Sequence, residues 1–280
     1  MHILEIAKKV YRRLIVENDI KKIYHKWIIS NCEKSIYGKR LREIKNIHKG
    51  EKCIIVGNGP SLTSKDLDAI CDANIITFGT NRIFKIFLST KWRPTYYVVE
   101  DPDIIRGFCD EIDAVPSKIK FIPLQIKWYE TRKKFKDVLY FWQNYDPKKN
   151  FKYSFSSNID KQIDHTGTVT CTCIIIAAYM GFSEINLIGV DHSYSWQTDE
   201  KGNVVANKTI KNHFCENYND EYFYKVEPPN LGKTTHSYAN MRAYCDEHDI
   251  KIFNATRGGK LEAFERKSLD DIVPKNSTSI

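Results

Sequence analysis

The chain has 280 residues, of which 42% are hydrophobic and 28% charged, a composition typical of a globular protein with a full-sized core. No apolar run reaches the roughly 18–20 residues of a membrane-spanning helix, and charges interrupt the first apolar positions, unlike in a signal peptide. The net charge is +8, yet residues 51–280 are balanced, because residues 1–50 hold 13 Lys/Arg against 5 Asp/Glu. The basicity therefore belongs to an N-terminal arm, which argues against nucleic-acid binding by the rest of the chain.

Residues 3–28 carry apolar side chains at helical spacing, with lysines and arginines beside them. We expect residues 1–50 to be a basic amphipathic helical arm and residues 273–280 a flexible tail. Such an arm can lie on an anionic membrane surface through residues 1–30, pack on its own domain, or pair with a second subunit. The eight scattered cysteines, whose one close pair has no metal-ligating neighbours, favour reduced thiols in a cytoplasmic protein.

The stretch 53–62 is the strongest local signal. Its apolar residues Cys53–Val56 predict a buried strand, Gly57 and Gly59 a tight turn, and the residues from Ser61 a helix. A strand, glycine turn and helix start can bring free amides and a helix dipole to a phosphate. The spacing is neither the dinucleotide fingerprint nor a Walker motif, so a β–α turn without a ligand is an equal alternative.

The same strand-then-polar-loop pattern returns at residues 74–78, 95–99, 120–124, 184–190 and 251–256, with helices at about 168–180 and 232–248. This alternation predicts a Rossmann-like α/β domain over 51–272, with a mostly parallel sheet flanked by helices. Residues 126–165 read as an irregular, lid-like insertion. Ligands bind at the carboxyl ends of such strands, so Asn58, Asn81 and Asp101 are expected to line one crevice.

Several segments occur in an order that resembles bacterial sialyltransferases of glycosyltransferase family 42, and more closely the 6-hydroxymethylpterin pyrophosphokinase-like (MptE-like) family. The segments are Gly57-Asn58-Gly59-Pro60-Ser61, Phe78-Gly79-Thr80-Asn81-Arg82, Asp101-Pro102, residues 180–191, Asn212-His213-Phe214 and residues 254–262. The resemblance covers residues 50–272 and implies a nucleotide-activated sugar, a Rossmann-like sheet with a lid, and no required metal.

Carried over position by position, the resemblance implies a donor site and a general base. It sets the turn Asn58-Gly59-Pro60-Ser61 at the nucleotide phosphate, Asn81 at the activated donor, and Thr166-Gly167-Thr168 at the base and ribose. Asp101 stands where sialyltransferases have asparagine, Tyr194 lies near the tyrosines that hold the leaving phosphate, and His213 lies in the segment that carries the base. The expected nucleotide- and donor-binding residues are Gly57, Asn58, Gly59, Pro60, Ser61, Asn81, Arg82, Asp101, Thr166, Gly167, Thr168, Asp191 and Tyr194.

Glycosyl transfer without a metal needs amides, hydroxyls and cations around the leaving phosphate, and a base for the acceptor hydroxyl. Ser61, Tyr194 and either Arg82 or Lys260 are suitable phosphate partners. A histidine that titrates near neutral pH suits the base, so His213 is the first candidate and His192, after a strand end, the second.

We therefore expect a glycosyltransferase that uses CMP-sialic acid or a related CMP-nonulosonic acid to modify a bacterial surface polysaccharide or lipooligosaccharide at the inner face of the membrane. The enzyme alternative is a pyrophosphokinase in which Asp101, Asp103 and Asp191 hold Mg²⁺ against a nucleotide. The alternative is that Asp103 caps a helix after Pro102 and that Asp191 caps a loop. A third alternative is a polysaccharide-assembly protein without catalysis.

Overall fold

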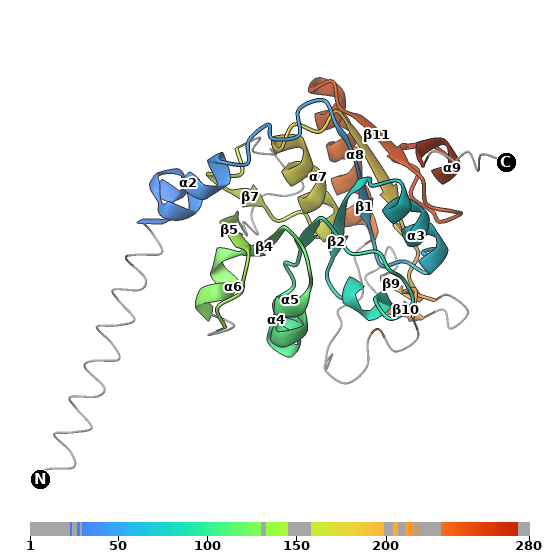
Figure 1. Ribbon diagram of the computed structural model, residues 1–280, viewed down its shortest axis with the longest axis horizontal. Helices are drawn as coiled ribbons and strands as arrows, with labels where there is room; N and C mark the ends of the chain where they lie inside the picture. The colour runs from blue at the N-terminus through green and yellow to red at the C-terminus, as the bar shows by residue number, and fades with distance from the viewer. Residues whose placement is uncertain are drawn as a thin grey trace, which may run out of the picture.

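The computed structural model describes residues 30–129, 133–144, 158–198, 204–206, 211–215 and 231–273, together with residues 23, 27, 28 and 218. Within these ranges the fold is α/β, built on an eight-stranded sheet in which every neighbouring pair is parallel (Figure 1). The strand order is β12-β11-β8-β1-β2-β3-β4-β5. The predicted Rossmann-like sheet is confirmed.

The sheet grows in two directions from its central strand, β1 (Lys52–Val56). On one side lie β2 (Ile76–Thr80), β3 (Tyr96–Val98), β4 (Ile119–Pro123) and β5 (Val138–Phe141). On the other side lie β8 (Glu184–Ile188), β11 (Lys251–Asn254) and β12 (Glu265–Arg266). The chain order therefore reverses between β1 and β8, and a crevice forms at such a point in open α/β sheets.

Helices cover both faces of the sheet. Ile54 and Val56 pack in one core with α3 (Ser64–Asp72), α4 (Pro102–Gly107) and α5 (Cys109–Ala114). Cys53 and Ile55 point to the other core, with α7 (Val169–Tyr179) and α8 (Leu231–Glu247). Because both faces of β1 are covered, a continuous apolar run rather than an alternating one encodes it.

Side-chain caps fix the helix starts at the carboxyl edge of the sheet. Thr63 begins α3 in a capping box with Asp66, and Thr168 begins α7. At α4 the cap is Asp101, which accepts hydrogen bonds from the amides of Asp103 and Ile104, with Pro102 at the first helical position. The expectation that Asp103 caps this helix is therefore wrong by two residues.

The predicted lid-like insertion is wrong for the described part of residues 126–165. Residues 124–129 form α6 (Leu124–Tyr129), and the four buried residues of β5 extend the main sheet. Farther along, β6 (Gln143–Asn144) pairs with β7 (Ile163–Asp164). Residues 130–132 and 145–157 of the predicted insertion lie outside the described residues.

Smaller elements complete the described chain. These are η1 (Cys32–Lys34), η2 (Ile83–Ile86), the antiparallel pair β9 (Trp196–Thr198) and β10 (Val204–Ala206), and α9 (Leu269–Ile272). The strand expected at 74–78 begins two residues later, because Asn74 adopts a left-handed turn at φ 52° after α3.

The described part of the N-terminal arm packs on the sheet. Its helix α2 (Ile36–Arg42) lies against β5, and Leu41 and Ile44 belong to the core that contains α7. His48 stacks on Phe182 with ring centroids 4.6 Å apart. Most of the expected helix at 3–28 and the tail after 273 lie outside the described residues.

Among the described residues, no helix is both long and apolar enough to cross a bilayer. All eight cysteines are free thiols, and five of them are buried.

Candidate functional site

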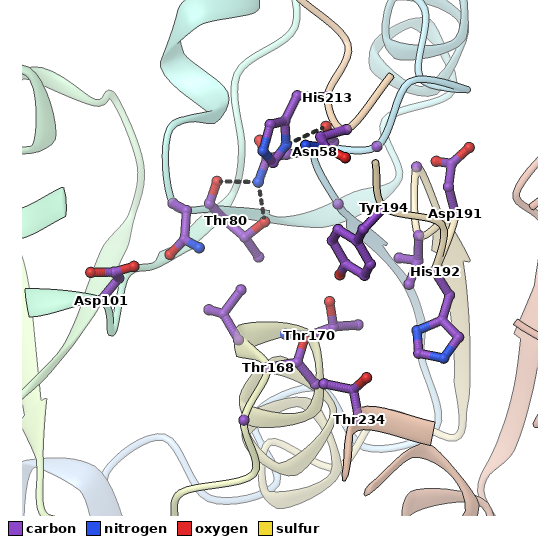
Figure 2. Close-up of a pocket in the computed structure, with 18 of the residues that line it drawn as sticks. Asn58, Thr80, Asp101, Thr168, Thr170, Asp191, His192, Tyr194, His213 and Thr234 are labelled. Carbon is purple, nitrogen blue, oxygen red and sulfur yellow. Dashed lines mark hydrogen bonds between the residues drawn. The ribbon is translucent and has the colours of Figure 1, made fainter. Parts of the chain in front are cut away.

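A cavity of about 520 Å³ opens at the carboxyl ends of β1, β2, β3 and β8, where the chain order reverses (Figure 2). The N-terminus of α7 and the first turns of α8 close its other side. Its lining is Gly57, Asn58, Gly59, Thr80, Asn81, Glu100, Asp101, Pro102, His165, Gly167, Thr168, Val169, Thr170, Gly189, Val190, Asp191, His192, Ser193, Tyr194, Asn212, His213, Tyr218, Thr234 and Tyr238.

Three amides of the glycine turn after β1 are bonded within the protein, although we expected free amides here. The amide of Gly57 donates to the Ile188 carbonyl at 2.8 Å and that of Gly59 to the Gly189 carbonyl at 2.8 Å. The Ser61 amide donates to Asp191 Oδ1 at 3.2 Å. The turn is thus bonded to the end of β8 and the segment after it, and these three amides are not free to bind a phosphate.

Positions 57 and 59 are glycine because neighbouring atoms leave no room for a Cβ. A Cβ on Gly57 would collide with the carbonyl of Gly189, and one on Gly59 would collide with the Asp191 carboxylate. The turn is therefore closely packed, and Asn58 between the two glycines lines the cavity.

The Asn58 side chain has a fixed orientation. Its Nδ2 donates to the carbonyl and to Oγ1 of Thr80, each at 3.0 Å. Because a carbonyl can only accept, the amide nitrogen must face Thr80, and the opposite atom, Oδ1, is an acceptor.

His213 has the geometry of a neutral general base. Its Nδ1 lies 3.3 Å from the Asn58 carbonyl, so Nδ1 carries the proton and donates, and Nε2 keeps its lone pair. The ring stacks on Tyr218 with centroids 3.8 Å apart. Burial lowers the pKa of His213 to about 4, so the imidazole is neutral at pH 7 and the expectation that it titrates near neutral pH is wrong.

This pKa is open to direct measurement. In an NMR titration of ¹³C-labelled histidine, we expect the His213 signal, identified by its loss in His213→Gln, to change with a midpoint near 4. The reason is that the charged imidazolium loses its hydration in this wall. A midpoint near the ordinary value of 6.5 would show an imidazole open to water.

The side of the cavity opposite Asn58 is rich in hydroxyl groups. Thr168 and Thr170 stand at the start of α7, after Gly167 at φ 77°, and the Tyr238 hydroxyl lies 3.4 Å from Thr168 Oγ1. Figure 2 shows the Tyr194 ring reaching between Asp191 and α7, with its hydroxyl directed into the cavity. Burial raises the pKa of Tyr194, so its hydroxyl stays a donor at neutral pH. Hydroxyl donors beside a helix N-terminus suit an anion.

Two of the three aspartates that were candidates for Mg²⁺, Asp101 and Asp191, lie on opposite sides of the cavity, and Asp103 is not in its lining (Figure 2). Asp101 is the cap of α4, and Asp191 accepts from Ser61 Oγ at 2.8 Å. Burial raises the pKa of both carboxyl groups. Among the described residues no three His, Cys, Asp or Glu side chains are grouped so that they could hold a metal ion. These residues therefore do not form a ready-made Mg²⁺ site.

The structure brings nine of the predicted donor residues and His213 into the lining and leaves four outside it. The residues outside are Pro60, Ser61, Arg82 and Thr166. Arg82 is 1% exposed, and its guanidinium lies 4.0 Å from the Phe108 ring centre. It is therefore buried behind the surface of the cavity. Lys260 is also absent from the lining, whereas His192 is in it and lies 2.7 Å from Thr235 Oγ1.

Sequence reasoning missed other lining residues. Glu100 directly precedes Asp101 and Thr170 lies two residues after Thr168, so the rule that strand ends and helix starts face the crevice would have found both. Thr234 and Tyr238 come from α8, whose first turns reach the cavity through the packing of α8 on α7 and β11.

Comparison with known proteins matches a family model, and the similar solved structures include two glycosyltransferases. The family model described as 6-hydroxymethylpterin diphosphokinase MptE-like matches residues 27–197. The MAf glycosyltransferase of Magnetospirillum magneticum AMB-1 has a TM-score of 0.50 and 18% identity over 84% of this chain, which spans only 38% of that protein. A structure of the sialyltransferase CstII of Campylobacter jejuni with cytidine-5′-monophosphate has a TM-score of 0.44 and 14% identity, over 78% of this chain and 85% of that one. No curated protein matches the chain.

The MAf likeness shows a shared α/β fold and, at this identity, nothing finer. The match to the family model carries more weight, because it extends over more than half of the chain, from residue 27 to residue 197. The protein therefore belongs to the MptE-like family.

Proposed function

We propose that the protein is a glycosyltransferase that moves a sugar from a nucleotide donor, CMP-sialic acid or a related CMP-nonulosonic acid, to a bacterial surface polysaccharide or lipooligosaccharide. The observation that carries the proposal is His213, a neutral imidazole with its tautomer fixed by Asn58, in the wall of a hydroxyl-lined cavity. The shared fold with a glycosyltransferase agrees with it.

The chemistry follows from these positions. Nε2 of His213 takes the proton of the acceptor hydroxyl as the acceptor oxygen bonds to the anomeric carbon. The bond between that carbon and the phosphate oxygen breaks, and CMP leaves with the electron pair. The hydroxyls of Tyr194, Thr168 and Thr170, with the α7 dipole, stabilise the charge on the leaving phosphate.

The charges of the lining favour a donor with one phosphate group. Among the described residues that line the cavity, none is a lysine or arginine, whereas Glu100, Asp101 and Asp191 are acidic. A pyrophosphate or triphosphate carries more charge and would need a cation in this wall. The donor's phosphodiester needs only hydroxyl groups and a helix end.

The second candidate is a Mg²⁺-dependent pyrophosphokinase, the activity in the family's description. Asp101 and Asp191 favour it, because each has a carboxylate in the cavity wall. These two aspartates lie on opposite sides of the cavity, and each already accepts hydrogen bonds from the protein. The nucleotide's own phosphates would therefore have to supply most of the Mg²⁺ ligands.

Incubation with labelled CMP-sialic acid, CTP or ATP, with and without EDTA, separates the candidates. We expect CMP release that continues in EDTA, because hydroxyls and a helix end replace the metal. Mg²⁺-dependent AMP release from ATP would instead support the pyrophosphokinase. Binding of none of the nucleotides would overturn both and support a non-catalytic assembly protein.

The acceptor and location follow from the same proposal. We propose peripheral membrane contact through residues 1–30, whose basic charge suits an anionic leaflet and would bring the enzyme to a membrane-linked acceptor. Pairing of two subunits through this arm is the alternative use of the same residues.

A further inference from the structure

Arg82 is a buried cation behind the part of the cavity wall that holds His213. It lies two residues after β2, is only 1% exposed and is not in the cavity lining. Burying a guanidinium is costly unless hydrogen bonds and ring contacts replace its hydration. The contacts that offset this cost join Arg82 to one residue of the lining, Tyr218.

Two hydrogen bonds and a ring contact hold Tyr218 against Arg82. Nη1 of the guanidinium donates to the Tyr218 carbonyl, and the Arg82 backbone amide donates to the Tyr218 hydroxyl at 3.2 Å. The guanidinium carbon lies 5.3 Å from the centre of the Tyr218 ring and 4.0 Å from that of Phe108. Tyr218 is therefore fixed at both its backbone and its hydroxyl, and these two contacts set the plane of its ring.

The Tyr218 ring forms one side of the His213 site. The two rings are stacked, with centroids 3.8 Å apart and planes inclined by 21°. The hydrogen bond from His213 Nδ1 to the Asn58 carbonyl is 3.3 Å long, whereas such bonds are usually about 2.9–3.0 Å, so it constrains the imidazole only weakly. The stacked ring therefore supplies the constraint that keeps Nε2 pointing in one direction.

The charge of Arg82 acts on His213 in a second way. Burial is the larger cause of the lowered pKa of His213, and the neighbouring cation adds to it by disfavouring another positive charge. Loss of this charge would raise the pKa toward the working pH and make His213 a better base. Loss of orientation would slow the reaction, so the two roles predict opposite changes in rate.

We propose that Arg82 is a positioning residue for sugar transfer, which holds Tyr218 and, through the Tyr218 ring, orients His213 for proton transfer from the acceptor. This inference rests on the proposed function. It gives Arg82 a role that fits its burial, in place of the phosphate contact that its sequence neighbours suggest.

The test is Arg82→Met, which fills the buried space with an unbranched apolar chain and removes the cation. We expect kcat for CMP release from CMP-sialic acid, with water as the acceptor, to fall about 10–100-fold, because misplacing a reacting group by about 1 Å can cost 100-fold. Affinity for CMP should stay within about threefold, since the hydroxyls assigned to the phosphate lie across the cavity. In the NMR titration, the His213 midpoint should rise although kcat falls.

Arg93→Met is the matched control. The Arg93 guanidinium lies 4.4 Å from the centre of the Phe87 ring and donates to backbone carbonyls, as that of Arg82 does. It precedes β3 and so lies at the opposite end of the strands from the cavity. We expect wild-type kcat and a His213 midpoint near 4 in this variant.

Tyr218→Leu tests the route of the effect, because it removes the ring between Arg82 and His213. If Arg82 acts through this ring, Arg82→Met/Tyr218→Leu should lose no more kcat than the worse single variant. Wild-type kcat in Arg82→Met, a loss confined to CMP affinity, or losses that multiply in the double variant would each overturn the inference and leave the proposed function standing. If Arg82→Met does not fold, Tyr218→Leu decides, and wild-type kcat there overturns the inference. If the wild-type protein releases no CMP, the proposed function itself fails.

Discussion

Replacing His213 with alanine is expected to lower kcat for sugar transfer by about 10²–10⁴-fold, the usual contribution of a positioned general base. Nδ1 is occupied by the Asn58 carbonyl, so the lone pair on Nε2 is the proton acceptor that the variant loses. Affinity for CMP should fall little, because the hydroxyl groups that we assign to the phosphate lie on the opposite side of the cavity. Steady-state kinetics and CMP titration on the same preparation measure the two quantities.

His192→Ala is the matched control. His192 lines the same cavity, its pKa is also lowered by burial, and its Nε2 already faces Thr235 Oγ1 at 2.7 Å. We expect the control to lose less than tenfold in kcat, since a nitrogen engaged with a hydroxyl is a poor proton acceptor. Wild-type turnover in His213→Ala, together with loss in His192→Ala, would move the base to His192.

Gly59→Ala is expected to lower the free energy of unfolding by about 2–4 kcal/mol and to weaken CMP binding at least tenfold. The added Cβ would meet the Asp191 carboxylate and the Gly189 carbonyl. Either the turn or Asp191 must move, which breaks the bonds from Ser61 to Asp191 and displaces the Asn58 side chain. Urea denaturation and CMP titration measure both effects.

Two further variants test whether the collision with Asp191 causes the loss of stability in Gly59→Ala. Gly50→Ala, at φ 82° with open space around its Cβ, should lose only about 1 kcal/mol, the cost of the left-handed conformation. In Gly59→Ala/Asp191→Gly the colliding carboxylate is gone, so part of the lost stability should return. Equal losses at Gly50 and Gly59 would mean that the turn tolerates a side chain and that the contact with Asp191 matters little.

The sheet could be predicted because burial on both faces leaves an unbroken apolar run in each strand. Cys53–Val56 shows this pattern, and the polar residues after each run predicted the cavity edge that contains Asn58, Asn81 and Asp101. The strand Val138–Phe141 has the same apolar pattern and was missed, because the aromatic and polar residues on both sides hid it.

The hydrogen bonds at the cavity could not be predicted, because they join segments far apart in the sequence. The glycine turn after β1 is equally compatible with amides that face a phosphate and with amides bonded to a neighbouring strand. The choice depends on β8, which lies about 130 positions later and reaches Ser61 through Asp191. Arg82 is similar: its sequence neighbours suggest a phosphate ligand, and only the packing of Phe108 and Tyr218 around it shows that it is buried.

A crystal structure of the protein soaked with CMP tests the central claim most directly. We predict the nucleotide in the cavity at the carboxyl ends of β1 and β8, with its phosphate within hydrogen-bonding distance of the Tyr194 hydroxyl and the first residues of α7. A nucleotide bound elsewhere on the protein, or a phosphate against the glycine turn with Tyr194 turned away, would contradict it.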